Sequence, residues 1–303
     1  MNIFASIFAN DILPIFIVAA VGFALARFSD TSVKTLSAVS FNALSPCLVF
    51  DQLVRSSIGG GVFGRMVIFC ILLTTVMGIV AWIAAMPFRL NRQTLTSFLL
   101  VVMFSNSGNY ALPVVLFAFG REALAYASVY FVASAIVTYT VGVGVAASGR
   151  GDVRHVLKGI VRVPALYAVA AAGLVLVTQT IVPVAILRPI TLMGDAAIPV
   201  MLLILGMQLE RAVMPNRPGI VALAVGLSLF VGPIVGIALT MGLGLTGLAR
   251  QVAIVGASMP AAVITTVLAL EFDLDASFAT GAVFLSTILS PFTLVVLLAY
   301  LQR

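Results

Sequence analysis

The chain has 303 residues, of which 62% are hydrophobic and 9% are charged. Its mean hydropathy is +1.23, whereas about a quarter of the residues in a soluble domain are charged. Composition therefore excludes a soluble globular domain and predicts a polytopic membrane protein. The formal net charge of +6 comes from 16 Lys and Arg residues scattered singly between apolar stretches, so we expect no basic face and no nucleic-acid partner.

Apolar spans follow one another along the whole chain. About 20 apolar residues cross a bilayer as a helix. This length predicts an all-α protein with ten spans, at 7–27, 33–54, 65–87, 94–119, 123–147, 160–180, 189–209, 219–245, 251–270 and 276–301. Residues 1–11 lack the positive region and the Ala-x-Ala cleavage signal of a signal peptide, so we expect the first span to be retained.

The cations between the spans predict the orientation. With the N-terminus outside, the inner loops hold ten of the 16 cations: Arg27, Lys34, Arg89, Arg92, Arg150, Arg154, Lys158, Arg162, Arg211 and Arg217. Cytoplasmic loops carry the excess of positive charge. We therefore expect both termini on the extracytoplasmic side of the cell inner membrane, a basic cytoplasmic loop at 149–162, and a solvated position for His155.

A polar run interrupts the fourth span. The sequence Ser105-Asn106-Ser107-Gly108-Asn109-Tyr110-Ala111-Leu112-Pro113 combines amides, hydroxyls, glycine and proline at about mid-span. Hydrocarbon offers no partners to the backbone groups that such a break frees, so it is tolerated only beside protein or a water-filled cavity. The run therefore predicts a site for a solute.

The second half of the chain resembles the first at an offset of about 150 residues. Pro14 and Gly22 match Pro164 and Gly173, Asn42 and Pro46 match Asp195 and Pro199, and the break at Ser105–Asn109 matches Ala257–Ala261. We predict a first five-helix repeat at 1–148 and a second at 163–303. Because each repeat has an odd number of spans, the two insert with opposite orientation, and a pair of interrupted spans is typical of a transporter's midplane site.

The two breaks resemble motifs of a known family. Asn106-Ser107-Gly108-Asn109-Tyr110-Ala111-Leu112-Pro113 is similar to the Asn-x-Gly-Asn-x-x-Leu-Pro stretch of the auxin efflux carrier family, in the bile-acid/auxin transporter superfamily, and Ala257-Ser258-Met259-Pro260 is similar to its late Ala-Ser-Met-Pro. The resemblance covers nearly the whole chain. The long central loop of most plant members is missing, so the chain looks like the bacterial members, which are linked to dicarboxylates such as malonate and malate.

The resemblance implies an architecture and a mechanism. Spans 1, 2, 6 and 7 would form a scaffold domain, and spans 3–5 and 8–10 a transport domain in which the broken spans 4 and 9 cross. The carrier would work by elevator-type alternating access, with the transport domain sliding against the scaffold. The superfamily also suggests a homodimer through the scaffold.

We predict that a small organic anion, a carboxylate such as malonate, malate or an auxin-like acid, binds at the breaks. No Lys or Arg lies near the centre of a span, so the N-termini of the half-helices, each with about half a positive charge, would attract the anion. The predicted binding residues are Asn42, Asn106, Ser107, Gly108, Asn109, Tyr110, Pro113, Ser258, Met259 and Pro260. The alternative is that the Asn and Ser side chains only join helices.

Asp195 is a candidate for proton coupling. An ionisable residue inside a span is costly and is by default a functional candidate, and desolvation would make its carboxylate a proton acceptor. The alternative is a carboxylate that reaches the interface near a helix end, and the sequence leaves both open.

We expect no cofactor and no metal. Cys47 and Cys70 lie in apolar sequence as small hydrophobic residues. An intramembrane enzyme would need paired aspartates, a Ser/His dyad or a His/Glu cluster, and the chain has one histidine. Two alternatives to this carrier remain. One is a sodium-coupled symporter of the bile-acid type, and the other is a receptor that binds an organic acid without transporting it.

Overall fold

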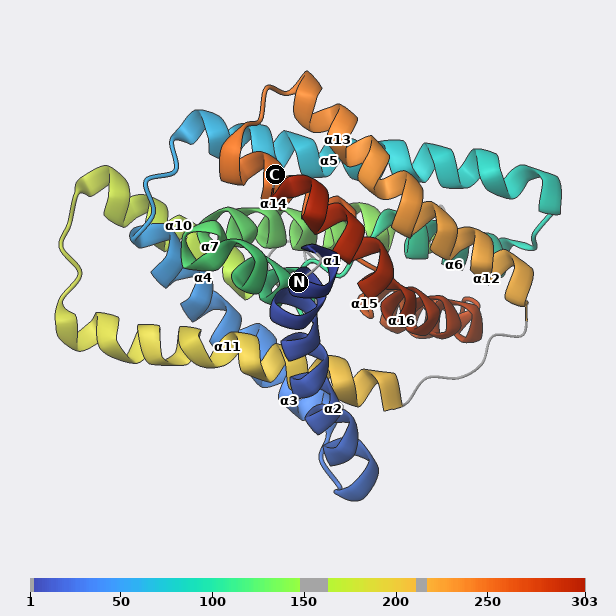
Figure 1. Cartoon of the computed structure of the whole chain (residues 1–303), viewed down its shortest axis with the longest axis horizontal. Coiled ribbons are helices and arrows are strands. Elements are labelled where there is room, and N and C mark those ends of the chain that lie inside the picture. Colours follow the sequence, from blue (N-terminus) through green and yellow to red (C-terminus); the bar gives the residue numbers. More distant parts are fainter. Residues whose placement is uncertain (1–2, 148–162, 211–216, 303) are drawn as a thin grey trace.

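The computed structural model describes residues 3–147, 163–210 and 217–302, and helices make up nearly all of this part of the chain (Figure 1). The predicted basic loop at 149–162, with His155, lies outside the described residues, as does Arg211. No strand is formed in the described part beyond one isolated β-bridge. The expectation of an all-α protein is therefore confirmed for these residues.

The first half of the chain begins with two long helical runs. Ile3–Phe28 is continuous through α1, η1 and α2, and Val33–Val54 through α3, η2 and α4. The next helices are α5 (Gly60–Ala85) with the short η3 (Met86–Phe88), α6 (Arg92–Met103), α7 (Ala111–Val137), η4 (Thr138–Gly142) and α8 (Val143–Ala147). The first of the two long runs consists of α1 (Ile3–Ile7), η1 (Phe8–Ile12) and α2 (Leu13–Phe28), and the second of α3 (Val33–Val39), η2 (Ser40–Leu44) and α4 (Ser45–Val54).

The described part of the second half contains α10 (Pro164–Thr178), α11 (Val184–Glu210), α12 (Pro218–Gly226), η5 (Leu227–Val231), α13 (Gly232–Gly242), α14 (Gly247–Ala257), α15 (Ile264–Glu271) and α16 (Ala276–Leu301). Pro164 and Pro218 lie in the first turn of their helices, where the missing N–H costs nothing. Asp275 caps α16 through the N–H of Phe278 and also accepts a hydrogen bond from Thr94 at the start of α6. The starts of α6 and α16 are thereby joined.

Seven helices among the described residues are long and apolar enough to cross a membrane: Ile3–Phe28, Val33–Val54, Gly60–Phe88, Ala111–Ala147, Val184–Glu210, Pro218–Gly242 and Ala276–Leu301. α10 and α14 are shorter and also apolar. The chain is therefore a multi-pass membrane protein. Several spans agree with the predicted ranges, and the second does so to the residue.

Both predicted breaks are present. Phe104–Tyr110 separates α6 from α7, and Ser258–Val263 separates α14 from α15. A third change of direction falls at Gly120, whose φ of +78° and ψ of −176° lie outside the helical region and within the span of α7. This turn divides the end of the fourth predicted span, at residue 119, from the start of the fifth, at 123.

The helices form two packing groups. α2 packs on α11, and α4 packs on both α10 and α11, while α5, α6, α7 and α12–α16 pack mainly on one another (Figure 1). α2 and α11 touch through their backbones. A Cβ atom at Gly22 would overlap the carbonyl of Leu203, and one at Gly206 would overlap the carbonyl of Ala19. Small residues at this crossing allow the close approach, as in many membrane helix pairs.

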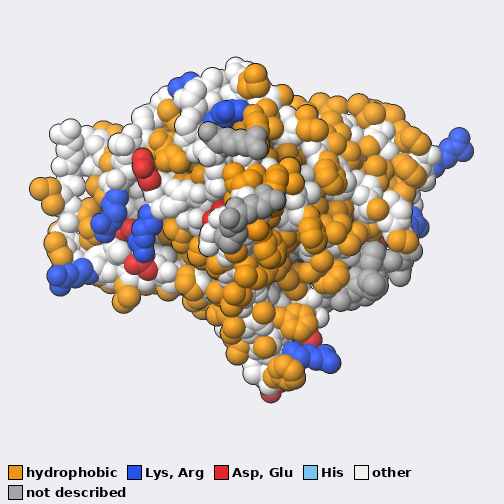
Figure 2. Space-filling view, viewed as in Figure 1, with side chains coloured by type: hydrophobic (Ala, Val, Ile, Leu, Met, Phe, Trp, Pro, Cys, Tyr) orange, Lys and Arg blue, Asp and Glu red, His pale blue; other side chains and the backbone are white. Residues whose placement is uncertain are grey.

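The surface has the apolar character that lipid requires. Large hydrophobic side chains stand well exposed along several helices, for example Val177, Ile181, Leu192 and Phe292. Figure 2 shows a broad hydrophobic area across the middle of the molecule, with charged side chains gathered mainly toward its ends. A patch of this size on a soluble monomer would mark an interaction surface. Here the surrounding bilayer covers it.

Candidate functional site at the crossing of two broken helices

The two breaks pair with each other. Ser105 and Ala261 form an isolated antiparallel β-bridge. The N–H of Asn106 donates to the carbonyl of Pro260 at 2.8 Å, and the N–H of Ala262 donates to the carbonyl of Phe104 at 2.9 Å. Each break therefore supplies backbone partners that the lipid could not provide to the other. We call residues 104–110 and 258–263 together the crossover.

Buried hydroxyl groups hold the crossover from behind. Ser286 on α16 accepts a hydrogen bond from the N–H of Ala261 at 3.2 Å. Ser290, one turn further along α16, donates to the hydroxyl of Tyr110 at 2.9 Å. Ser105 donates to the carbonyl of Gly256 at 2.9 Å. The crossover is thus fixed to α14 and α16 by three serine hydroxyls, of which Ser286 and Ser290 are fully buried.

A cavity of about 350 Å³ lies against the crossover. One wall comes from the group of α3, η2, α4 and α11, and the opposite wall from the crossover, α7, η4 and the start of α15. None of the lining residues is charged. They are Ser37, Ala38, Ser40, Phe41, Asn42, Ser45, Ser105, Asn106, Ser107, Gly108, Asn109, Phe131, Ala135, Thr138, Tyr139, Met201, Ile204, Gln208, Ala262, Val263, Ile264 and Val267.

Half of the predicted binding residues line this cavity. Asn106, Ser107, Gly108 and Asn109 reach it from the crossover, and Asn42 reaches it from η2 on the opposite wall. The amide nitrogen of Asn42 already donates to the carbonyl of Ala38 at 2.8 Å. Asn109 is partly buried on the wall. The cavity therefore brings together polar residues that are far apart in the sequence.

The other predicted binding residues do not line the cavity. Tyr110 is fully buried against Ser290, and Pro113 is buried in the first turn of α7. The hydroxyl of Ser258 donates to the carbonyl of Ile254 in its own helix, at 2.6 Å. Pro260 contributes a carbonyl to the pairing of the breaks. These residues shape the crossover, and no direct contact with the cavity is formed by them in this conformation.

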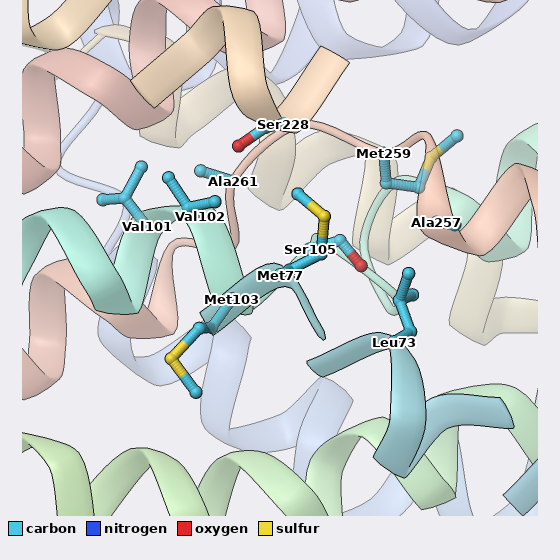
Figure 3. A pocket seen from close by; sticks show the side chains of 10 residues that line it. All are labelled: Leu73, Met77, Val101, Val102, Met103, Ser105, Ser228, Ala257, Met259 and Ala261. Carbon is cyan, nitrogen blue, oxygen red and sulfur yellow. The ribbon is translucent and has the colours of Figure 1, made fainter. Parts of the chain in front are cut away.

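Met259 lines a second, very small cavity on the other side of the crossover. Figure 3 shows this space between α5, α6, η5 and the crossover, with the hydroxyls of Ser105 and Ser228 among apolar and methionine side chains. Its volume is about 10 Å³, close to the space of one water molecule. It is therefore too small for an organic anion.

Two amide groups at the large cavity have unpaired atoms. Asn106 is 6% exposed, and its side-chain nitrogen has no hydrogen-bond partner among the described residues. The same holds for the side-chain oxygen of Gln208 on α11. Gln208 lies near the end of a predicted span, where the sequence alone favours a solvated or capping side chain. The packing of α11 places Gln208 at the cavity, and no local sequence pattern predicts this packing.

Apolar and aromatic side chains form the rest of the cavity wall. Phe41 from η2 and Tyr139 from η4 face each other with ring centroids 6.0 Å apart and ring planes tilted by 47°. Phe131 packs against Gly108, where a Cβ atom would lie 3.0 Å from its ring. Glycine at this position therefore lets the crossover approach the ring. The cavity offers a polar end at the crossover and an apolar body.

Asp195 lies away from the crossover cavity. It lines a separate cavity of about 200 Å³ with Gln52, Arg121 and Leu202, and its carboxylate accepts a hydrogen bond from Arg121 at 3.1 Å. Its side chain is 48% exposed. The desolvation that we expected at Asp195 is therefore absent, because the carboxylate is half-exposed and has a cation partner. The proton-coupling role stays a prediction.

A neighbouring polar network joins α4 to α11. The carboxylate of Asp51, which is only 7% exposed, accepts hydrogen bonds from Arg55 at 2.9 Å and from Thr191 at 2.6 Å. Arg55 also donates to Thr191 at 3.0 Å. Asp51 lies near the end of a predicted span, where the sequence alone favours a solvated or capping side chain. The packing of α4 on α11 instead buries its carboxylate, and these polar partners compensate for the burial.

The described residues contain no group of three His, Cys, Asp or Glu side chains that could hold a metal ion. Cys47 and Cys70 are free thiols, and Cys70 is buried. The residues that line the crossover cavity offer hydrogen-bonding groups, and the helix starts beside it offer dipoles.

Comparison with known proteins identifies the family. A family model described as membrane transport protein matches residues 7–155 and 152–298. The chain belongs to this family, the auxin efflux carrier family. An uncharacterized transporter of Methanothermobacter thermautotrophicus is 26% identical over 286 residues, which cover 93% of this chain and 94% of the relative. An uncharacterized transporter of Methanocaldococcus jannaschii is 28% identical over 225 residues, 71% of each chain.

Membership of this family points to a transporter and not to an enzyme, as the sequence predicted. Both of these relatives are named only as transporters. The chain is thus a membrane transport protein whose substrate has to be argued from its own residues.

Proposed function

We propose that this member of the auxin efflux carrier family is a secondary transporter of a small organic anion that binds in the crossover cavity. The observation that carries the proposal is the amide of Asn106, which is almost fully buried beside a cavity of about 350 Å³ and lacks a partner. A buried donor without a partner costs about 1–3 kcal/mol. A carboxylate that accepts a hydrogen bond from this amide removes that cost.

The start of α15 and the segment that leads into α7 supply the positive potential. Gly108 and Asn109 precede α7, and Val263 and Ile264 begin α15, and all four line the cavity. Helix N-termini favour anions through their dipoles and their N–H groups. No lining residue is cationic, so the cavity has no side chain that would neutralise the two negative charges of a dianion. This favours an acid with one carboxylate in the cavity, such as an auxin-like acid, over a dianion such as malonate or malate.

The two packing groups support elevator-type alternating access. We propose a protein of two inverted five-helix repeats with ten spans in all. The spans Ile3–Phe28 and Val33–Val54, with α10 and α11, would form the scaffold, and α5–α8 and α12–α16 would carry the crossover past it. The cavity lies between the groups, with Met201 and Gln208 on one wall and Asn106 on the other. Movement of one group against the other would therefore change the access to bound substrate.

We also propose the membrane placement that the cations predict, with both termini on the extracytoplasmic side of the inner membrane and with a homodimer through the scaffold. A sodium-coupled symporter and a receptor without transport activity remain the alternatives. No acidic residue lines the crossover cavity, so a sodium site there would lack a carboxylate ligand. The receptor is separated from the carrier only by measuring flux.

The test is uptake of radiolabelled malonate, malate and indole-3-acetate into proteoliposomes, with and without imposed proton and sodium gradients. Asn109→Ala removes an amide from the cavity wall. Asn10→Ala is the matched control, because Asn10 is exposed and, among the described residues, its side chain bonds to Ser6 of the same helical run. Saturable flux that Asn109→Ala abolishes and Asn10→Ala retains supports the carrier. Binding without flux supports the receptor. Equal flux in wild type and Asn109→Ala overturns the site.

A further inference from the structure

The crossover cavity presents an unpaired donor on one wall and an unpaired acceptor on the other. The donor is the side-chain nitrogen of Asn106 on the crossover, and the acceptor is the side-chain oxygen of Gln208 on α11. Both atoms are shielded from solvent and neither has a partner among the described residues. Each belongs to a side chain that lines the cavity, and a ligand there would meet the atom only after the amide group has turned toward it.

Three other polar residues of the cavity wall already have partners for their donors. Asn42 donates to Ala38, Ser45 donates to the carbonyl of Ser40 at 2.8 Å, and Thr138 donates to the carbonyl of Ser134 at 2.8 Å. Each of these side chains therefore donates a hydrogen bond to a backbone carbonyl in the preceding turn of its own helical run. Gln208 differs, because its unpaired atom accepts and does not donate.

We propose that Gln208 is a specificity-determining residue that accepts a hydrogen bond from an O–H or N–H group of the transported acid while Asn106 binds its carboxylate. This inference rests on the proposed function and narrows it. The substrate class becomes a monoanionic organic acid that carries a hydroxyl or an N–H group on an apolar or aromatic body. The apolar body would pack against Phe41, Phe131 and Tyr139.

The expected selectivity follows from the cost of leaving a buried hydrogen-bonding group without a partner. A site that is built to pair with a substrate O–H or N–H group rejects the analogue that lacks it, because the buried partner is then left unpaired. One such bond in the crossover cavity would change affinity by about tenfold, which corresponds to about 1.4 kcal/mol. Because no charged side chain lines the cavity, a difference in affinity between the two acids of a pair would not come from an ion pair with the wall.

The experiment measures equilibrium binding to the purified full chain with matched pairs of acids. Indole-3-acetate is compared with 1-methylindole-3-acetate, which lacks the N–H group, and mandelate with phenylacetate, which lacks the hydroxyl. Malate and succinate form a dianionic pair that separates the effect of charge from that of the donor. The proteins are wild type, Gln208→Met and Gln52→Met. Gln52 is the matched control because it lines two cavities near Arg121 and is absent from the wall of the crossover cavity.

In the wild type we expect the donor-bearing monoanion of each pair to bind about ten times more tightly than its partner. Gln208→Met should bring this ratio close to one and leave the affinity of the donor-free acid unchanged, while Gln52→Met retains the ratio. Thermal stability of Gln208→Met should equal or exceed that of the wild type, because the replaced oxygen has no partner to lose. A residue with a merely structural role would lower it.

A ratio near one in the wild type, or a tenfold ratio that survives in Gln208→Met, overturns the role of Gln208. The proposed carrier function would be retained in that case, provided that the acids bind to the wild type and that Asn109→Ala abolishes binding. If no acid of the panel binds to the wild type, both the proposed function and this inference are overturned. If Gln208→Met does not fold, Gln208→Asn shortens the side chain by one methylene, and its ratio is measured in its place.

Discussion

Arg121 and Asp195 form an ion pair with a distance of 3.1 Å that joins α7 of one packing group to α11 of the other. Arg121 directly follows the turn at Gly120, so it stands at the end of the half-helix that begins at the crossover. Asp195 lies on the helix that also carries Gln208. One residue pair thus connects the two groups at a distance from the crossover cavity.

We expect loss of this ion pair to change transport more than stability. The side chains are 73% and 48% exposed, and an exposed pair contributes about 0.2–1 kcal/mol. Asp195→Asn and Arg121→Gln should therefore shift the melting temperature very little. If Asp195 binds the coupled proton, Asp195→Asn alone abolishes the pH dependence of uptake. An unchanged pH dependence in Asp195→Asn, measured in proteoliposomes, would contradict the proton role.

Asn106→Leu should separate binding from stability. The amide nitrogen of Asn106 has no partner to lose, so an apolar side chain of similar volume should leave the melting temperature unchanged or raise it. The same change removes the donor that we assign to the carboxylate and should abolish substrate binding. Calorimetric titration and thermal unfolding in detergent check the two effects. A marked loss of stability would show that the amide has a structural partner.

Ser286→Ala should loosen the crossover. Ser286 accepts the N–H of Ala261, and its removal leaves a buried backbone donor unpaired at a cost of about 1–3 kcal/mol. Thr287→Val is the matched control, because the hydroxyl of Thr287 donates to the carbonyl of Val283 in its own helix and, in the described part of the chain, makes no hydrogen bond to the crossover backbone. We expect lower thermal stability and weaker substrate binding in the serine variant alone. Equal losses in both variants would point to general packing of α16.

Gly22→Ala should destabilise the protein, whereas Gly173→Ala should not. These glycines match each other in the internal repeat, but their surroundings differ. A Cβ atom at Gly22 would overlap the backbone of α11, while a Cβ atom at Gly173 would meet nothing within 4 Å. Overpacking costs about 1–3 kcal/mol. Retention of a monodisperse peak after heating in detergent checks the difference.

Thr191→Val should weaken the contact between α4 and α11. Thr191 donates to the buried carboxylate of Asp51, and loss of a hydrogen bond to a charged group costs about 1.5–3 kcal/mol. Thr280→Val is the control, because the hydroxyl of Thr280 donates to the carbonyl of Ala276 in its own helix and, among the described residues, to no charged group. Thermal unfolding of the two variants should therefore differ. A similar shift in both would show that Arg55 alone satisfies the carboxylate.

Regular features of the fold were predictable because they depend on local sequence. Apolar length marked the spans, and the run from Ser105 to Pro113 marked the first break because its amides, glycine and proline have no place in a lipid-facing helix. The self-similarity of the halves then located the second break at Ala257–Ala261. These signals need no knowledge of which helices touch.

Side-chain partners at the site could not be predicted in the same way. Whether Gln208 faces a cavity or the helix end depends on how α11 packs, and the pairing of Asp195 with Arg121 joins residues of different packing groups. Ser258, Met259 and Pro260 belong to the predicted motif, yet none lines the large cavity. Motif membership identifies the crossover as a unit, and only the packing separates residues at its surface from those that support it.

The pairing of the two breaks also sets an order of events during synthesis. The N–H of Asn106 bonds to Pro260, and the carbonyl of Phe104 bonds to Ala262, so the first break finds these partners only in the second half of the chain. Until the ribosome has delivered that half, the backbone of the first break must keep contact with water or with the insertion machinery. Completion of this transporter's centre therefore requires the synthesis of both halves, and a chain that ends before Pro260 lacks the backbone partner of Asn106.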